Sequence, residues 1–154
     1  MSDVIVRNEP AFEVAALAHA GPYFEIGRTF VRHWDLIVEH NLVGKHGHGV
    51  AFYYDDPSTV PAADLRSHAG VIIETGLPLP DIFDRLTIPA GRVAVLTYKG
   101  PYIGIPGAWE ALYGGWLPGS NEKVADRVPY ERYLNEMYNT APEDLLTEIC
   151  LPLK

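Results

Sequence analysis

The chain has 154 residues, 47% of them apolar, and a formal net charge of −8. This length and composition are typical of one globular domain with a sizeable core, and they exclude a disordered chain. The twelve Lys and Arg residues are scattered, whereas nucleic-acid binding requires clustered ones, so we expect no contact with nucleic acid. The sequence has neither a membrane-length apolar run nor a secretory N-terminus, and the single Cys150 fits a reducing compartment. We therefore predict a cytoplasmic protein with no membrane contact.

A sequence repeat is the strongest signal in the chain. Residues 10–23 read PAFEVAALAHAGPY and residues 89–102 read PAGRVAVLTYKGPY, which are identical at eight of fourteen positions. Chance would give about one identity at average residue usage. We predict one domain, residues 1–154, built from internal repeats of about 4–74 and 84–153.

The first repeat begins with a strand predicted near residues 12–19, followed by the turn Gly-Pro-Tyr. A helix follows, because apolar residues recur three and four positions apart: Ile26, Phe30, Trp34 and Ile37. Strands predicted at 49–54 and 71–74 close the repeat. The segment 75–87 is then expected to connect the two repeats.

The second repeat shows the same order. A strand is predicted at 91–98, where β-branched residues are frequent, and a second Gly-Pro-Tyr turn follows. Helical spacing links four apolar residues: Ile105, Trp109, Leu112 and Trp116. Strands are predicted at 130–134 and 148–153. The fold class is therefore α+β, with duplicated strand-helix-strand-strand units, pseudo-twofold symmetry, an antiparallel sheet with helices on one side, and a central cleft.

The best candidate for chemistry lies on the predicted strand at 130–134. Alternation places Glu131 and Tyr133 on one face, and an offset of 79 residues matches them to Phe52 and Tyr54. Across a pseudo-twofold axis these four side chains would line one cavity. A carboxylate among aromatic rings favours an organic cation, and it would also suit a general base.

Other interpretations stay open for each of these residues. Glu131 could be a solvated strand residue paired with Arg132 or Lys123. Trp34 and Trp109 lie on helical stripes, which are typical of core packing.

Three further aromatic residues are candidates for ligand contact. Trp116, at the helix end, could pack in the core or overhang a ligand. Tyr98 and Tyr102 flank the Lys-Gly-Pro segment of the second turn and are also predicted to bind ligand.

The remaining motifs predict little chemistry. His46 and His48 offer two metal ligands with no third at a useful spacing, so we expect no metal and no cofactor. Asp55-Asp56-Pro57 is typical of a turn that ends a strand. Cys150 lies in an apolar strand, which favours an inert core thiol over a reactive one.

Taken in order, the motifs resemble the GyrI-like small-molecule-binding superfamily over nearly the whole chain. That group includes the bacterial DNA gyrase inhibitor and the effector-binding domains of multidrug-sensing transcription regulators. The resemblance rests on eight segments: His19–Tyr23, Tyr53–Pro57, Pro61–Arg66, Ile88–Arg92, Lys99–Tyr102, Trp116–Pro118, Tyr130–Asn135 and Leu151–Leu153.

The resemblance implies a ligand cleft between the two repeats, with Glu131 matching the family's pocket glutamate through its Tyr-Glu-x-Tyr context. It also implies lipophilic cations as ligands, or hydrolysis of strained cyclopropane-containing toxic natural products by some stand-alone members. The family often has an apolar residue at the position of Arg132, so this chain departs from the pattern there.

Three functions follow as hypotheses. The first is binding of bulky hydrophobic small molecules, including cations, in an aromatic pocket, for drug or toxin sensing or resistance. The second is a GyrI-like hydrolase that uses Glu131 as its catalytic residue. The third is inhibition of DNA gyrase through protein–protein contact. We expect the chain to lack the DNA-reading module of a complete regulator.

Overall fold

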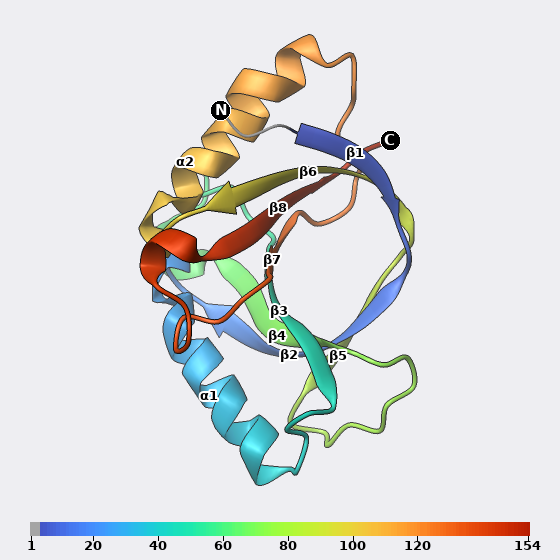
Figure 1. Cartoon of the computed structure of the whole chain (residues 1–154), viewed down its shortest axis with the longest axis vertical. Helices are drawn as coiled ribbons and strands as arrows, with labels where there is room; N and C mark the ends of the chain where they lie inside the picture. The colour runs from blue at the N-terminus through green and yellow to red at the C-terminus, as the bar shows by residue number, and fades with distance from the viewer. Residues whose placement is uncertain (1–3) are drawn as a thin grey trace. The chain divides into compact units, whose positions relative to one another are not determined.

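A computed structural model describes residues 4–154, which form two compact units (Figure 1). Unit 2 is Ala11–Pro89, and unit 1 comprises the described residues up to Pro10 together with Ala90–Lys154. Within the described residues, no helix is both long and apolar enough to cross a membrane.

Unit 2 contains a four-stranded antiparallel sheet in the order β3-β4-β2-β5 and one long helix. Its elements are β2 Phe12–Ala20, α1 Ile26–Glu39, β3 His46–Tyr53, β4 Arg66–Ile73 and β5 Asp84–Ile88. The helix packs on one face of this sheet over a cluster of buried apolar residues: Ala15, Leu17, Ile37, Leu42, Val71, Ile73 and Phe83.

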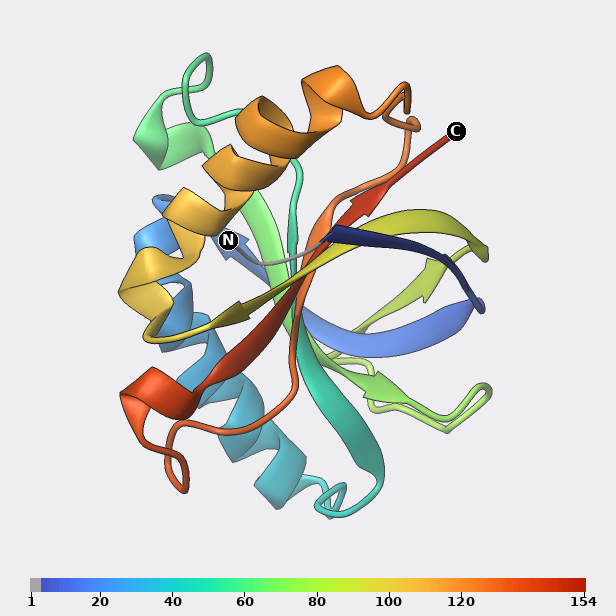
Figure 2. The same cartoon turned by 45° about the horizontal axis from the view of Figure 1, so that its top comes forward.

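Unit 1 contains a four-stranded antiparallel sheet in the order β1-β6-β8-β7. Its elements are β1 Val4–Glu9, β6 Gly91–Lys99, α2 Ile105–Glu110, β7 Tyr130–Tyr133 and β8 Leu146–Pro152. A π-helical segment, Ala111–Trp116, continues α2, and Figure 2 shows the two as one coil. This coil packs on a second apolar cluster: Ala94, Leu96, Ile105, Ala108, Leu112, Ile149, Leu151 and Leu153.

Short 3₁₀ turns complete the helical content. They lie at Tyr23–Glu25, Ala62–Asp64, Tyr102–Gly104, Leu117–Gly119 and Pro142–Asp144.

The Gly-Pro-Tyr turns owe their repetition to backbone geometry. Gly21 has φ +116° and Gly100 has φ +148°, conformations that side-chain-bearing residues rarely adopt. The Gly21 N–H donates to the Leu65 carbonyl at 2.8 Å, and the Gly100 N–H donates to the Leu145 carbonyl at 2.9 Å. In each unit, glycine therefore lets the chain turn away after β2 or β6 while its N–H keeps a hydrogen bond to the residue that precedes β4 or β8.

The predicted α+β class and antiparallel pairing are confirmed within each unit, and so is the helix on one side of each sheet. Two strands were not predicted. The segment 75–87, expected to be a connection, contains the start of β5, and β1 has no counterpart in the prediction. Both are edge strands of five or six residues, with most side chains exposed or half-buried, so their apolar pattern is weak.

The two sheets repeat the same pairing register, which defines matched positions. Ala15 on β2 pairs with Val71, and Ala94 on β6 pairs with Leu151. The first strands are thus offset by 79 residues, whereas the partner strands β4 and β8 are offset by 80. One additional residue in the second half therefore separates the helix from the strand that follows it.

Candidate functional site

Glu131 lies on β7 and points to the face of the unit 1 sheet that α2 covers. Its strand partner is Ile149, a member of the apolar cluster beneath α2. Directly paired residues share a face in an antiparallel sheet. Only 4% of the Glu131 surface is exposed, so its carboxylate is buried.

Two neutral donors bind this carboxylate, one at each oxygen. The Trp109 indole N–H donates to Oε2 at 2.7 Å, and the Tyr133 hydroxyl donates to Oε1 at 2.8 Å. Hydrogen bonds to the charged form stabilise it in a buried place. The Trp109 and Tyr133 side chains, which carry no formal charge, therefore fix the orientation of the Glu131 carboxyl group.

The two aromatic donors of Glu131 each contact a further tyrosine ring. The Tyr102 and Tyr133 rings lie 5.6 Å apart between centroids, and the Trp109 and Tyr113 rings stack at 5.9 Å. Burial raises the pKa of Tyr102, and the negative charges of Glu136 and Glu131 raise it further. We call Tyr102, Trp109, Glu131 and Tyr133 the acidic aromatic cluster.

Two predicted ligand residues, Tyr98 and Trp116, pack on the same apolar cluster of unit 1. The hydroxyl of Tyr98 donates to the Pro101 carbonyl at 2.8 Å. A Cβ atom at Gly104 would collide with this hydroxyl. Tyr98 therefore stabilises the turn, because its hydroxyl donates its hydrogen bond to the turn backbone.

Sequence reasoning missed two members of this region. Trp109 was expected to be a core residue, and it does pack on the core. Its indole N–H also donates a hydrogen bond to Glu131. Thr147 pairs with both Tyr98 and Tyr133, and within residues 4–154 its buried hydroxyl has no hydrogen-bond partner. The i, i+4 spacing of Ile105 and Trp109 indicated only a buried face, and no sequence pattern marks a hydrogen bond between a helix and a strand.

The alternative of a solvated Glu131 paired with Arg132 or Lys123 is wrong. Glu131 is buried, and Arg132, its neighbour along β7, points to the opposite face of the sheet. Trp34 lies on α1 as predicted, but the expectation that it packs in the core is wrong, because 46% of its surface is exposed. Its ring contacts His46.

The predicted match of Phe52 and Tyr54 to Glu131 and Tyr133 is corrected by one residue. Tyr53 pairs with Ser67, as Tyr133 pairs with Thr147, so the offset at these strands is 80. A slip of one residue moves a side chain to the other face of a sheet. Phe52 and Tyr54 therefore lie on the face of unit 2 that is turned away from α1.

The matched positions in unit 2 hold a ring pair without a carboxylate. Tyr53 matches Tyr133, and Ala51 matches Glu131. The Tyr23 and Tyr53 rings lie 4.8 Å apart between centroids, and their counterparts in unit 1, Tyr102 and Tyr133, are also in ring contact, at 5.6 Å. The hydroxyl of Tyr23 donates to the Asp55 carbonyl at 2.9 Å.

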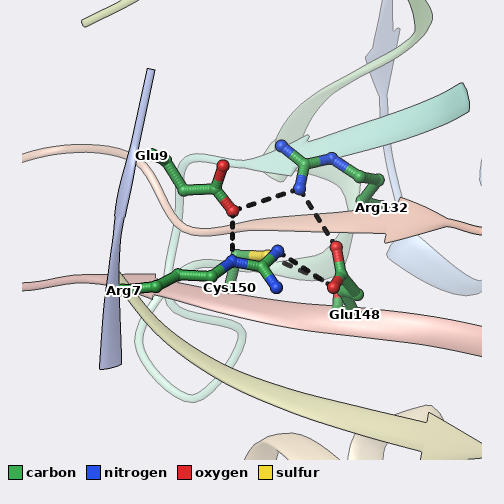
Figure 3. A network of polar contacts seen from close by, with 5 residues as sticks. All are labelled: Arg7, Glu9, Arg132, Glu148 and Cys150. Atoms are coloured by element: carbon green, nitrogen blue, oxygen red, sulfur yellow. Dashed lines mark hydrogen bonds and ion pairs between the residues drawn. The ribbon is translucent and has the colours of Figure 1, made fainter. Parts of the chain in front are cut away.

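A charged network occupies the opposite face of the unit 1 sheet (Figure 3). Arg7 contacts Glu9 at 2.6 Å and Glu148 at 2.9 Å, and Arg132 contacts the same two carboxylates at 3.3 and 3.0 Å. In Figure 3, positive and negative side chains alternate around this network: Arg7 and Glu9 come from β1, Arg132 from β7 and Glu148 from β8. This network explains why an arginine stands at position 132, where the family often has an apolar residue: its guanidinium pairs with both Glu9 and Glu148.

Cys150 lies beside this network and is fully buried, as the apolar strand predicts. Burial raises the pKa of the thiol to about 12. The protonated thiol is a poor nucleophile, so this cysteine is inert at neutral pH.

The two glycine-flanked histidines, His46 and His48, lie at the start of β3. The structure contains no group of three or more His, Cys, Asp or Glu side chains placed to hold a metal ion within residues 4–154.

Comparison with known proteins gives a consistent family. Residues 2–154 match the GyrI-like small-molecule-binding domain. A DNA gyrase inhibitor of Yersinia enterocolitica is 30% identical over 141 residues, which cover 88% of each chain. The transcriptional regulator BrlR of Pseudomonas aeruginosa is 29% identical over 83% of this chain, which spans 47% of that regulator.

Solved structures agree on the fold. The C-terminal domain of EcmrR superposes with a TM-score of 0.77 at 15% identity, covering 100% of this chain and 98% of that one. SAV2435, solved bound to tetraphenylphosphonium, superposes with a TM-score of 0.67 at 11% identity, covering 99% and 94%. Together with the match over residues 2–154, these comparisons show that the chain belongs to the GyrI-like small-molecule-binding family.

Proposed function

We propose that the chain binds bulky hydrophobic organic cations at the acidic aromatic cluster of unit 1. The observation that carries this proposal is the buried carboxylate of Glu131, whose two oxygens accept hydrogen bonds from Trp109 and Tyr133. Both of these donors are neutral, so each stabilises negative charge on Glu131 by a hydrogen bond and adds no positive charge of its own. A cation nearby gains both charge attraction and cation–π contact, the latter about 0.5–2 kcal/mol.

The surrounding rings suit a ligand with large apolar groups. Tyr102, Tyr133 and Trp109 offer aromatic surface, and the buried hydroxyl of Thr147 adds one polar group. Tetraphenylphosphonium, the molecule bound to SAV2435, has this chemistry: one delocalised positive charge inside four phenyl groups. It is therefore the probe of choice for this chain.

Calorimetry with two probes of the same shape tests the proposal. Tetraphenylphosphonium and tetraphenylborate differ in the sign of their charge, and we expect only the cation to bind. Glu131→Gln should weaken cation binding at least about tenfold, or about 1.4 kcal/mol. Glu143→Gln, an exposed change of equal charge, serves as the control and should leave affinity unaltered. Equal affinities for the two probes would contradict the proposal.

The internal duplication and the central cleft belong to the same proposal. The shared element order and the matched pairing registers support descent of the two units from one strand-helix-strand-strand motif. Pseudo-twofold symmetry and a cleft between the units concern their mutual placement, and both stay predictions.

A second function, contact with DNA gyrase, is favoured by the name of the Yersinia relative. The net charge of −8 offers a physical motive, because an acidic protein can compete with DNA for a basic surface. A supercoiling assay with purified protein tests it, and inhibition should weaken as salt is raised. Full gyrase activity at micromolar concentrations of this protein would remove the idea. Hydrolysis with Glu131 as the catalytic residue stays a prediction, and mass spectrometry of candidate substrates would detect it.

A further inference from the structure

Unit 2 contains a chain of three hydrogen-bonded side chains that has no part in the acidic aromatic cluster. The Tyr54 hydroxyl lies 2.7 Å from Nδ1 of His68, and Nε2 of His68 lies 2.9 Å from the carboxylate of Asp84. The three residues come from the end of β3, from β4 and from β5. Far apart in sequence, they form one continuous hydroxyl–imidazole–carboxylate chain.

The sheet register brings these residues onto one face. His68 pairs with Ala18 on β2, and Asp84 pairs with Ala16 two residues away on the same strand, so both point to the same side. Strand β2 lies between β4 and β5. Its two alanine side chains are short, which leaves room for the His68 ring to reach across to Asp84.

The hydrogen-bond roles follow from the carboxylate. An ionised carboxylate only accepts hydrogen bonds, so Nε2 of His68 carries the proton. In the neutral imidazole, Nδ1 is then an acceptor, and the Tyr54 hydroxyl donates to it. This is the arrangement by which a carboxylate orients an imidazole to take a proton from a hydroxyl nucleophile.

Tyr54 is accessible to a reagent, because 39% of its surface is exposed. Burial of the rest of the side chain, together with the charge of Asp84, raises its pKa to about 12. The hydroxyl therefore remains protonated at neutral pH. It becomes a strong nucleophile only if a base removes its proton as it attacks, and His68 lies in position to do so.

We propose that Tyr54 is an acyl-accepting nucleophile for activated aryl esters, with His68 as its general base and Asp84 as the residue that orients the base. The Tyr54 oxygen attacks the carbonyl carbon of the ester and forms a new carbon–oxygen bond. The bond between that carbon and the aryl oxygen breaks, and the phenolate departs with the electron pair. The proton of Tyr54 passes to Nδ1 of His68, and Asp84 stabilises the resulting imidazolium. This site is independent of the proposed cation binding.

The experiment uses p-nitrophenyl acetate with the full-length protein at neutral pH. Peptide mass spectrometry follows acetylation of each tyrosine over time. Tyr138 is an internal reference, because it is 81% exposed and interacts with a carboxylate, Glu136. We expect Tyr54 to acetylate about 100-fold faster than Tyr138, the enhancement typical of a positioned base.

Two variants separate this role from simple exposure. His68→Gln should bring the Tyr54 rate down to that of Tyr138, and Asp84→Asn should lower it at least about tenfold. Asp84 is exposed, so the Asn variant is expected to fold even if the Gln variant does not. Circular dichroism checks folding in both. Acetylation of Tyr54 no faster than that of Tyr138, or a Tyr54 rate unchanged in Asp84→Asn, would overturn the proposal.

Discussion

Unit 1 and unit 2 carry the same pair of rings beneath their helices, but only unit 1 combines them with a charge. Tyr102 and Tyr133 are matched by Tyr23 and Tyr53, and both pairs are in ring contact. Ala51 in unit 2 stands where unit 1 has Glu131. The ring pair is therefore common to both units, and the acidic group distinguishes one of them.

The donor changes together with the acceptor. Phe30 is the fifth residue of α1, and Trp109 is the fifth residue of α2. The unit with the carboxylate has an indole N–H at this position, and the unit with alanine has a plain phenyl ring. A buried carboxylate without a hydrogen-bond donor would destabilise the fold. The indole of Trp109 and the carboxylate of Glu131 therefore form one hydrogen-bonded pair that unit 2 lacks.

The opposite faces of the two sheets differ as well. Arg132 pairs with Glu148 in unit 1, and the matched pair in unit 2 is Phe52 with His68. Unit 1 thus has a network of four charges on this face, whereas unit 2 has a buried ring beside the His68 chain. Substitutions that exchange these features between units test what each one contributes.

The largest expected effect concerns Arg132. Its guanidinium contacts both Glu9 and Glu148, and its side chain is 11% exposed. Arg132→Met should lower the free energy of unfolding by about 3–5 kcal/mol, because buried carboxylates lose a cation. Urea denaturation measures the change. Lys99→Met, which removes an exposed pair with Asp144, is the control and should cost about 0–1 kcal/mol; a loss of that size at Arg132 would contradict the account.

Ala51→Glu places the unit 1 acid into unit 2. Ala51 is fully buried, and Phe30 supplies no N–H donor, so we expect a loss of about 3 kcal/mol in unfolding free energy. Ala51→Met has similar length without charge and separates crowding from ionisation. Adding Phe30→Trp to Ala51→Glu should recover part of the loss. Identical stability of the Glu and Met variants would show that charge is not the cause.

Trp109→Phe removes the indole donor and gives unit 1 the residue found in unit 2. Glu131 loses one hydrogen bond in a buried site, which should cost about 1–3 kcal/mol of unfolding free energy. Thermal and urea denaturation measure it. Trp116→Phe removes an equal area of ring without touching Glu131, and a cost as large as that of Trp109→Phe would assign the effect to packing.

The smallest expected effect is a change in pH dependence at His33. This buried imidazole lies 2.8 Å from the Ala15 carbonyl, and the matched residue in unit 1 is Leu112. Burial lowers the pKa of His33 from its ordinary 6.5. Below about pH 6.5, His33 binds a proton in the unfolded chain but not in the folded protein. The free energy of unfolding therefore decreases as the pH is lowered, by at most about 1.4 kcal/mol per pH unit.

His33→Leu should flatten this acid-side slope, whereas His48→Leu, at an exposed position, should not. Urea midpoints between about pH 5 and pH 7.5 provide the comparison. A slope that stays unchanged in His33→Leu would place the acid sensitivity elsewhere in the chain.

The fold class and the face of the sheet on which Glu131 lies were predictable, because each rests on a local pattern. Alternation on β7 placed Glu131 and Tyr133 on one face, and the structure agrees. The error at Phe52 and Tyr54 came from extending one offset across the extra residue before β7, where a single step reverses the face. Neither the indole bond of Trp109 nor the charges around Arg132 could be predicted, because they join residues 22 and 123 positions apart.

A crystal structure of the protein with tetraphenylphosphonium would show whether the cation binds at the acidic aromatic cluster. We expect phenyl groups against Tyr102, Trp109 and Tyr133, with the charged centre near the Glu131 carboxylate and about 6 Å or less from a ring centroid. A cation bound away from Glu131, or one seated equally well against Tyr23 and Tyr53 of unit 2, would contradict this expectation.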